Sequence, residues 1–459
     1  MRKLESYKRI MLLFLSGICM AGLIGIYAYF WFGQYYSLVK VYLQWWTKGH
    51  ALLLAIYGVL LFFFFHMYGG MRIGYLKNAE VIFSQILATF IVDLITYGQL
   101  SLLTRKLFPA PMYLGMVAVQ MVWIILWTNI ASIIYKNMFP PRKLLLVHGD
   151  RPIEDILEKF KKRKDKFEVS KCIHIKEGVE AICKEALERY DAVVLWDIPM
   201  ADRNAIMKFC YGKSLRIYVM PKIPDVILKG AEELHLFDTP LLLTREYSLT
   251  IEQRFMKRLI DLVCSVLLFI ITSPFMLLTA IAVKLYDGGP VLYKQVRCTT
   301  DGKEFKILKF RSMRVDAEKD GVARLASKGD SRITPIGKFI RKVRLDELPQ
   351  LINIIKGEMS FIGPRPERPE IIAQYMEVMP EFAYRMKVKA GLAGYAQVYG
   401  KYNTTPYDKL KLDLTYIENY SVWLDLKLML LTVKVLLWPD STEGVESNQI
   451  TALKKDNEE

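Results

Sequence analysis

The sequence predicts three parts: an α-helical membrane bundle over residues 1–140, a Rossmann-like α/β domain over 141–250, and a membrane-associated α+β domain over 251–459. Three observations predict this fold class. Four apolar stretches fill the first part, strand-like and helix-like segments alternate in the second, and the third joins one long apolar stretch to many basic residues. Of the 459 residues, 53% are hydrophobic and 24% are charged, which fits neither an ordinary soluble chain nor a wholly embedded one.

The N-terminal stretches each approach the ~20 residues needed to cross ~30 Å of hydrocarbon. They cover about 10–32, 51–68, 81–103 and 112–135. Lysine and arginine gather before the first stretch, between the second and third, and after the fourth, which predicts that the N-terminus and everything after the fourth span are cytoplasmic. Asp93 lies inside the third stretch, and we interpret it as a structural acid that faces the bundle or snorkels.

Strand and helix patterns alternate in the middle part, which predicts a parallel, doubly wound sheet. The strand-like segments are 143–147, 167–173, 192–196 and 215–220, and the segments with helical spacing are 154–164, 178–190 and 201–213. The first strand leads into a loop with the single glycine Gly149, where a dinucleotide-binding fold carries three. We therefore expect no NAD binding, and a regulatory or oligomerising role compatible with a homodimer.

The apolar stretch 259–286 is interrupted by Ser273-Pro274. Proline removes a backbone donor and disfavours helix at the residue before it, so the helix should break or kink there. Basic residues flank both ends, which favours a re-entrant segment that enters and leaves the bilayer by its cytoplasmic face. A kinked full crossing is the alternative. The later apolar segment 423–438 carries three charges and is interpreted as an interfacial or core helix.

Basic residues dominate the stretch after this segment. The formal net charge is +16, and residues 294–344 hold fifteen lysines and arginines. Between Phe305 and Arg311 basic and apolar residues mix as in a strand with one buried and one cationic face. Such a face beside a membrane segment suits lipid phosphates and diphosphates better than a duplex, so we expect no nucleic acid partner.

The sharpest local signal is the adjacent pair Asp346-Glu347. Pro349 favours the first turn of a helix that runs to about Lys356, with Gly357 as its C-cap. The two carboxylates then sit beside a helix N-terminus, where the macrodipole favours anions. Taken alone, such a pair is most often surface decoration.

Its surroundings change that interpretation. Arg344 lies just upstream, and Arg365 downstream is held between two prolines on a stiff backbone suited to clamp a phosphate. By itself the Gly363-Pro364-Arg365-Pro366 run would be taken as a structural turn. Together these residues fit phosphoryl transfer: a carboxylate nucleophile, a second carboxylate for a divalent metal, and arginines that neutralise a diphosphate.

Residues 251–438 resemble the bacterial sugar transferase family, the polyprenyl-phosphate hexose-1-phosphate transferases that start exopolysaccharide, capsule or O-antigen repeat units. The upstream layout resembles the long form of that family. The resemblance rests on segments that occur in order and with family spacing: Gly289-Pro290, Gln295-Val296-Arg297, Lys309-Phe310-Arg311-Ser312-Met313, Arg344 to Asn353, Lys356 to Ser360, Gly363 to Pro366, and Gly394 to Val398.

The resemblance implies a ping-pong reaction in which Asp346 attacks a UDP-sugar, releases UMP and holds a phosphosugar that passes to polyprenyl (undecaprenyl) phosphate. It implies Glu347 and Asp346 as Mg²⁺ ligands, and a re-entrant helix broken at Ser273-Pro274. It further implies a bacterial inner-membrane enzyme with its catalytic domain on the cytoplasmic face. The residues expected to bind substrate or phosphate are Arg297, Lys309, Arg311, Arg344, Arg365 and Lys401.

One departure concerns Lys401, because many relatives have arginine there and lysine lacks the bidentate geometry. The sugar is open, with glucose or galactose as the default. Two other functions compete: a glycosyltransferase that moves the sugar alone and releases UDP, and a non-catalytic sensor that binds lipid or nucleotide. The nucleotide released separates these possibilities.

Overall fold

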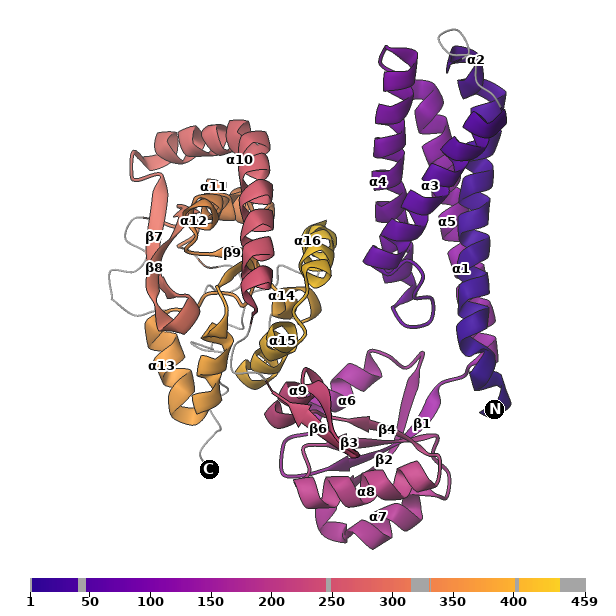
Figure 1. Cartoon of the computed structure of the whole chain (residues 1–459), viewed down its shortest axis with the longest axis vertical. Helices are drawn as coiled ribbons and strands as arrows, with labels where there is room; N and C mark the ends of the chain where they lie inside the picture. Colours follow the sequence, from indigo (N-terminus) through magenta and orange to yellow (C-terminus); the bar gives the residue numbers. More distant parts are fainter. Residues whose placement is uncertain are drawn as a thin grey trace. The chain divides into compact units, whose positions relative to one another are not determined.

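The computed structural model describes residues 2–39, 47–244, 249–314, 330, 332–400 and 404–437. The chain divides into two compact units, Met1–Met220 and Pro221–Glu459 (Figure 1). The boundary between them falls before the predicted domain limit at residue 250. The reason is that α9 (Ile223–Lys229) packs against α15 (Pro406–Glu418), where Ile223 and Val226 join the hydrophobic core of the second unit.

The first unit begins with the predicted membrane helices, which lie side by side in Figure 1. Their lengths and apolar content suffice to cross a bilayer, as the sequence predicted. The elements are α1 (Arg2–Phe30) with its continuations η1 (Trp31–Tyr35) and α2 (Tyr36–Val39), then α3 (Thr47–Tyr68), α4 (Asn78–Thr104) and α5 (Ala110–Met138).

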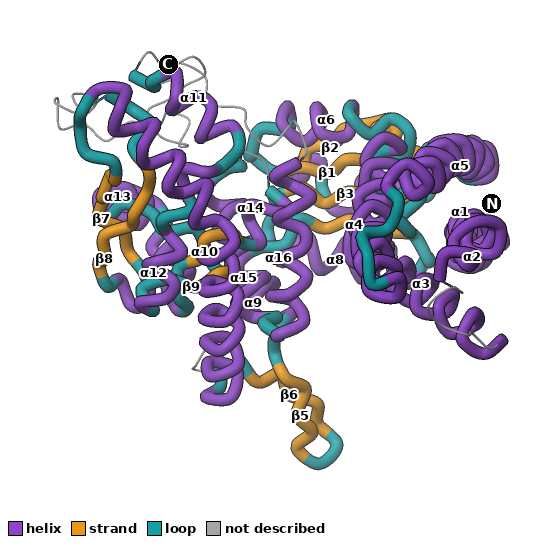
Figure 2. The backbone as a smooth tube through the Cα atoms, turned by 90° about the horizontal axis from the view of Figure 1, so that it is seen from above, coloured by secondary structure: helices purple, strands orange, loops and turns teal. Residues whose placement is uncertain are grey.

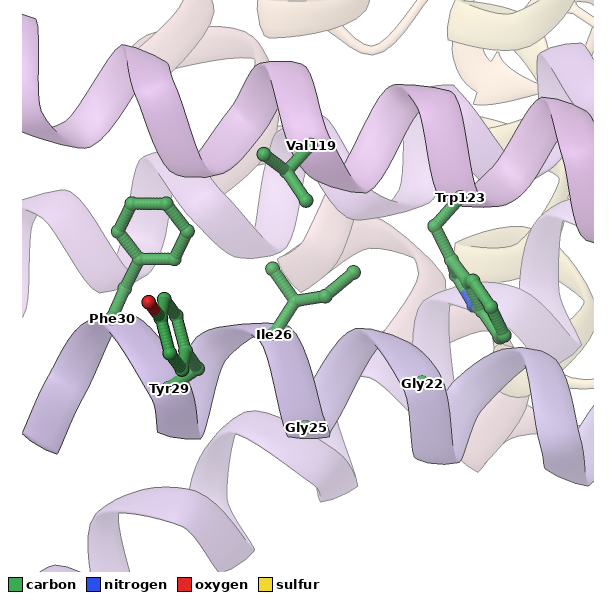
Figure 3. Close-up of a pocket in the computed structure, with 7 residues that line it drawn as sticks. All are labelled: Gly22, Gly25, Ile26, Tyr29, Phe30, Val119 and Trp123. Atoms are coloured by element: carbon green, nitrogen blue, oxygen red, sulfur yellow. The ribbon is translucent and has the colours of Figure 1, made fainter. Parts of the chain in front are cut away.

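Small and polar residues set the packing of this bundle. Gly22 of α1 lies against the Trp123 indole of α5, and a Cβ at Gly22 would overlap that ring. The Trp123 Nε1 donates to the Cys19 carbonyl at 3.0 Å. Beside this contact, Figure 3 shows a shallow apolar groove between the two helices. Asp93 is buried inside the bundle and accepts a hydrogen bond from the Tyr57 hydroxyl at 3.1 Å, so it faces the bundle interior.

The α/β part of the first unit confirms the predicted parallel sheet. The strands pair in the order β2-β1-β3-β4, with α6 on one face and α7 and α8 on the other (Figure 1). Close packing explains why a glycine occupies position 149 in this loop, because a Cβ there would collide with the Asp197 carbonyl. The elements are β1 (Arg142–His148), α6 (Glu154–Lys161), β2 (Phe167–His174), η2 (Ile175–Glu177), α7 (Val179–Ala186), β3 (Ala192–Trp196), α8 (Met200–Gly212) and β4 (Arg216–Val219).

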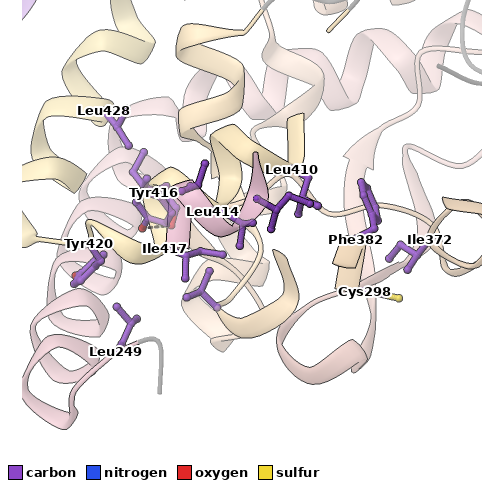
Figure 4. Packing of buried hydrophobic residues seen from close by; sticks show 14 of the residues in the cluster. Leu249, Cys298, Ile372, Phe382, Leu410, Leu414, Tyr416, Ile417, Tyr420 and Leu428 are labelled. Atoms are coloured by element: carbon purple, nitrogen blue, oxygen red, sulfur yellow. Dashed lines mark hydrogen bonds between the residues drawn. The ribbon is translucent and has the colours of Figure 1, made fainter. Parts of the chain in front are cut away.

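The second unit packs helices and short strands around several apolar clusters, and Figure 4 shows part of the one with the most buried residues. Its antiparallel hairpin of β5 (Glu232–Leu236) and β6 (Thr239–Leu243) projects beyond α9 and α15 in Figure 2. The remaining elements around the core are β7 (Leu292–Cys298), η3 (Thr300–Gly302), β8 (Glu304–Phe310), α11 (Pro335–Lys342), η4 (Leu345–Glu347), α12 (Gln350–Lys356), β9 (Ser360–Ile362), α13 (Pro369–Val378), η5 (Pro380–Lys387), β10 (Gly391–Ala393), α14 (Tyr395–Tyr399) and α16 (Val422–Leu437).

The long apolar segment of this unit forms α10 (Ile251–Asp287), which has Pro274 in its interior. Figure 1 shows α10 bent sharply along its length. The sequence predicted that the helix would break or kink at Pro274. Because α10 is continuous through this residue, the structure contains a kink. Ser273 adjusts to the bend locally, since its Oγ donates to the Ile270 carbonyl at 2.8 Å.

The apolar segment predicted as a helix forms α16 (Val422–Leu437), and one side of α16 is part of the core, with Leu428 fully buried. The buried carboxylate of Asp425 is compensated inside the protein. Asp425 accepts hydrogen bonds from the Lys257 ammonium at 2.7 Å and from the Tyr416 hydroxyl at 2.7 Å. This agrees with the prediction of an interfacial or core helix.

Candidate active site

The carboxylate pair lies in a turn whose backbone is set by three residues. Arg344 adopts a left-handed conformation with φ 60°, directly before η4. Pro349 is the N-cap of α12, and Gly357 ends that helix with φ 87°, as the sequence predicted. These constraints hold Asp346 and Glu347 at the entry to α12.

The two carboxylates lie in different surroundings. Asp346 is 8% exposed, and its Oδ1 has no hydrogen-bond partner among the described residues. The Oε1 of Glu347 instead faces three cations: Arg365 Nη2 at 2.9 Å, Lys309 Nζ at 3.4 Å and Arg344 Nη1 at 3.8 Å. One carboxylate therefore has an oxygen without a hydrogen-bond partner, and the other is surrounded by cations.

The pKa values of the pair move in opposite directions. Burial raises the pKa of Asp346, and the negative charge of Glu347 raises it further. Burial would also raise the pKa of Glu347, but Arg365, Lys309 and Arg344 together hold that pKa well below its usual range. Burial lowers the pKa of Lys309, against the pull of Glu347. Glu347 is thus ionised, while Asp346 is a more basic carboxylate.

Residues of α10 support both halves of this site. Arg258 donates to the last carbonyls of α12, at 2.6 Å to Ile354 and 2.7 Å to Ile355. Lys257 donates to the Ile362 carbonyl at 2.8 Å, directly before the Gly363–Pro366 run. The helix that bends at Pro274 therefore holds the segments that carry the carboxylate pair and Arg365.

A second charged cluster lies next to Arg365 and was missed by sequence reasoning. Its centre is Glu367, which pairs with Arg297 at 3.5 Å, with Arg385 at 3.8 Å and with Lys409. Despite burial, these cations hold the pKa of Glu367 at about 2. Arg385 also donates to the Arg365 carbonyl at 2.9 Å and pairs with Asp413 at 2.8 Å. Arg297 was predicted to bind substrate or phosphate, and Glu367 follows the Gly-Pro-Arg-Pro run, but the sequence did not indicate that the two would meet or that Arg385 and Lys409 would join them.

The predicted phosphate-binding residues fall into separate groups. Lys309, Arg344 and Arg365 surround Glu347, whereas Arg297 contacts Glu367 and the Pro366 carbonyl. Arg311 pairs with Asp287 at the end of α10. Lys401 lies outside the described residues. The structure thus brings three of the predicted cations to Glu347 itself, and the substrate-binding role of all six residues stays a prediction.

The carboxylate pair has the donor chemistry for Mg²⁺. Among the described residues no group of three or more His, Cys, Asp or Glu side chains is arranged to hold a metal ion. Mg²⁺ is usually held by one or two carboxylates together with substrate phosphates. The unpartnered Asp346 Oδ1 beside Glu347 meets this requirement, with phosphate oxygens to come from a substrate.

The site lies within a region that matches a known protein family. The profile of the family described as "Bacterial sugar transferase" matches residues 252–439, which contain the whole site described above. A sugar transferase of Bacillus subtilis (strain 168), described as uncharacterized and named EpsL, is 40% identical over 198 residues, covering 94% of its own length and 43% of this chain. The chain belongs to the bacterial sugar transferase family.

Longer relatives match as well. One is the UDP-N-acetylgalactosamine-undecaprenyl-phosphate N-acetylgalactosaminephosphotransferase of Aeromonas hydrophila, 37% identical over 258 residues, which are 54% of this chain and 59% of that protein. Another is the UDP-glucose:undecaprenyl-phosphate glucose-1-phosphate transferase of Escherichia coli (strain K12), 40% identical over 211 residues, 45% of this chain and 44% of that protein. The matches thus span about half the length of these two sugar transferases.

Proposed function

We propose that this sugar transferase moves a sugar-1-phosphate from a UDP-sugar to undecaprenyl phosphate, releasing UMP and starting exopolysaccharide, capsule or O-antigen repeat units. The observation that carries the proposal is the division of labour in the carboxylate pair. Asp346 is buried, has an Oδ1 without a hydrogen-bond partner among the described residues, and is more basic than usual. Glu347 beside it lies near three cations. The names of the relatives supply the substrate class.

In the first step, an Asp346 carboxylate oxygen attacks the phosphorus that bears the sugar. An O–P bond forms, the bond between that phosphorus and the bridging oxygen breaks, and its electron pair leaves with UMP. In the second step, a phosphate oxygen of undecaprenyl phosphate attacks the same phosphorus and frees the Asp346 carboxylate. The product is an undecaprenyl-diphosphate sugar. The intermediate is a phosphosugar on Asp346.

The surrounding residues reduce the repulsion between an anionic nucleophile and an anionic substrate. Arg365, Lys309 and Arg344 lie within 3.8 Å of Glu347 and can share their charge with the diphosphate as it enters. Mg²⁺ bound by Asp346, Glu347 and the diphosphate would supply further charge neutralisation. Arg385 holds the Arg365 carbonyl and so keeps this clamp in place.

The released nucleotide tests the proposal. Full-length protein in detergent, given a UDP-sugar, undecaprenyl phosphate and Mg²⁺, should produce UMP in step with the lipid product. Release of UDP would show a glycosyltransferase that moves the sugar alone. Lipid or nucleotide binding without turnover would show a non-catalytic sensor. The choice among UDP-glucose, UDP-galactose and UDP-N-acetylhexosamines follows from running the same assay with each.

The pH profile gives a second prediction, because Asp346 must be ionised to attack. The positive charge of Arg341 lowers the pKa of Asp346, so Arg341→Gln should raise that pKa and move the acidic limb of kcat/KM to higher pH. Lys342→Gln is the matched control, since Lys342 is exposed on the same helix. Identical profiles for both variants would contradict Asp346 as the group that sets this limb.

We also propose that α10 is re-entrant and that the catalytic unit lies on the cytoplasmic side of the inner membrane. The bend and the basic residues at both flanks support this topology. Single cysteines at the exposed positions Arg254 and Lys294 should be labelled from the same side of the membrane. Labelling from opposite sides would instead show a full crossing.

For the α/β domain we propose a Rossmann-like fold without a dinucleotide loop, with a regulatory or oligomerising role. The strand order β2-β1-β3-β4, covered by helices on both faces, supports the fold. An oligomerising role is compatible with a homodimer. Measuring the molecular mass of the detergent-solubilised protein tests whether it is a dimer.

A further inference from the structure

A cationic cluster lies in the first unit, where the membrane helices meet the α/β domain. Lys166 Nζ donates to the Tyr75 carbonyl at 3.0 Å and lies 4.6 Å from the centre of the Tyr75 ring. Arg163 Nη1 donates to the same carbonyl at 2.9 Å. Two cations from the turn after α6 thus converge on the loop between α3 and α4.

Lys8 of α1 extends the cluster from the other side. Its Nζ lies 5.9, 5.1 and 5.0 Å from the ring centres of Tyr75, Tyr135 and Phe139. These rings belong to the α3–α4 loop and to the end of α5. The ammonium is thus placed over aromatic faces at one end of the bundle.

The cations of this cluster repel one another. Burial, together with the charges of Arg163, Lys8 and Arg142, lowers the pKa of Lys166 to about 8, and Asp165 opposes this shift. Asp165 is at the same time engaged by Arg163 through hydrogen bonds of 3.0 Å to each of its oxygens. The groups that set this pKa are therefore mainly cationic, and a bound anion would relieve their repulsion.

The position of the cluster indicates which kind of anion would bind to it. Lys8 lies in the first turns of the candidate span Tyr7–Val39, and Tyr135 lies near the end of the span Ala110–Met138. Aromatic rings at span ends mark the level of the lipid headgroups, where anionic phosphates are concentrated. Ile10 and Phe14, which follow Lys8 on α1, are exposed and give an acyl chain an apolar surface. A soluble anion would have no use for this surface.

We propose that Lys8, Arg163 and Lys166 form a binding site for the phosphate headgroup of an anionic phospholipid, which couples the α/β domain to the membrane bundle. This site is separate from the residues assigned to sugar transfer. Its test therefore uses stability and lipid binding and needs no catalytic activity.

The test compares full-length protein in nanodiscs of phosphatidylcholine with discs in which about a quarter of the lipid is phosphatidylglycerol. The wild type should show a higher Tm in the anionic discs, and the rise should shrink at high salt. Lys8→Gln combined with Lys166→Gln should lose more than half of that rise. Lys8→Arg with Lys166→Arg should keep it, because the charges remain.

The matched control is Lys184→Gln with Lys208→Gln, which removes the same charge from exposed positions on α7 and α8. An equal loss in this control would show a general effect of bilayer charge and overturn the proposal. So would an equal rise in Tm when inorganic phosphate is added to phosphatidylcholine discs. If the double variant does not fold, the single variant Lys8→Gln decides, since it leaves the pairing of Lys166 with Tyr75 intact. A full Tm rise in that variant would overturn the site.

Discussion

Asp346→Asn is expected to reduce turnover by on the order of 10⁶-fold, the scale seen when the nucleophile of a covalent catalytic apparatus is removed. The amide has nearly the shape of the carboxylate but cannot form the phosphosugar ester. With a UDP-sugar labelled in the sugar, the wild type should carry a covalent adduct on Asp346 before undecaprenyl phosphate is added, and the variant should carry none. Substantial turnover by the variant would exclude the covalent route.

Stability measurements make the same experiment sharper. Because the folded pKa of Asp346 is raised, its ionised form is disfavoured by folding at every pH above its unfolded pKa. Asp346→Asn removes this destabilising negative charge, so the Tm of the variant near neutral pH should equal or exceed that of the wild type. Loss of activity in this variant then cannot be ascribed to unfolding.

Glu347→Gln is the control with the opposite sign. The folded pKa of Glu347 is depressed by Arg365, Lys309 and Arg344 in spite of burial, so its charge stabilises the fold at any pH above the unfolded value. The variant should therefore have a lower Tm at neutral pH and weaker Mg²⁺ dependence. Its deficit in Tm should shrink as the pH falls through the depressed pKa. Equal Tm changes in the two variants would contradict the opposite environments of the pair.

Local backbone chemistry made part of the site predictable from sequence. Pro349 and Gly357 mark the start and end of α12 because each has a conformational preference that acts without tertiary help. The same reasoning applies to the Pro274 kink. By contrast, Lys309 and Glu347 are 38 residues apart and meet only through packing of β8 against η4. A pattern of basic residues shows that cations are near, but it does not show which of them meets which carboxylate.

The contacts of α10 that support the site could not be predicted from the sequence for a related reason. Lys257 and Asp425 are 168 residues apart, and each looks like a charge at the edge of an apolar segment. The start of α10 did carry a local signal, the capping box formed by Thr250 and Gln253, which sets the helix start at Ile251. The apolar stretch used for the prediction begins at residue 259, so the prediction did not include Lys257, which lies in the first turns of α10 and is buried.

The second large effect is expected when the catalytic unit is produced as a separate fragment. The structure places the start of this unit at Pro221, before the predicted domain start at residue 251. A fragment of residues 251–459 would contain every residue assigned to chemistry, but it would lack Ile223, Val226 and Leu249 from the core of this unit. Burial of such side chains is worth ~1.5–3 kcal/mol each, so their loss costs roughly 5 kcal/mol or more. That is comparable with the whole stability of a domain, ~5–15 kcal/mol.

We therefore expect residues 221–459 in detergent to unfold cooperatively and to release UMP from a UDP-sugar, given undecaprenyl phosphate and Mg²⁺, whereas 251–459 should be unfolded or nearly inactive. The Bacillus subtilis relative supports the first expectation, since a match of 198 residues with this chain covers 94% of its length. The control is Ile223→Ala in the longer fragment, which should lower its Tm without changing KM. If 221–459 folded but stayed inactive, the upstream unit would take part in catalysis. If 251–459 matched the longer fragment in Tm, α9 would not belong to this core.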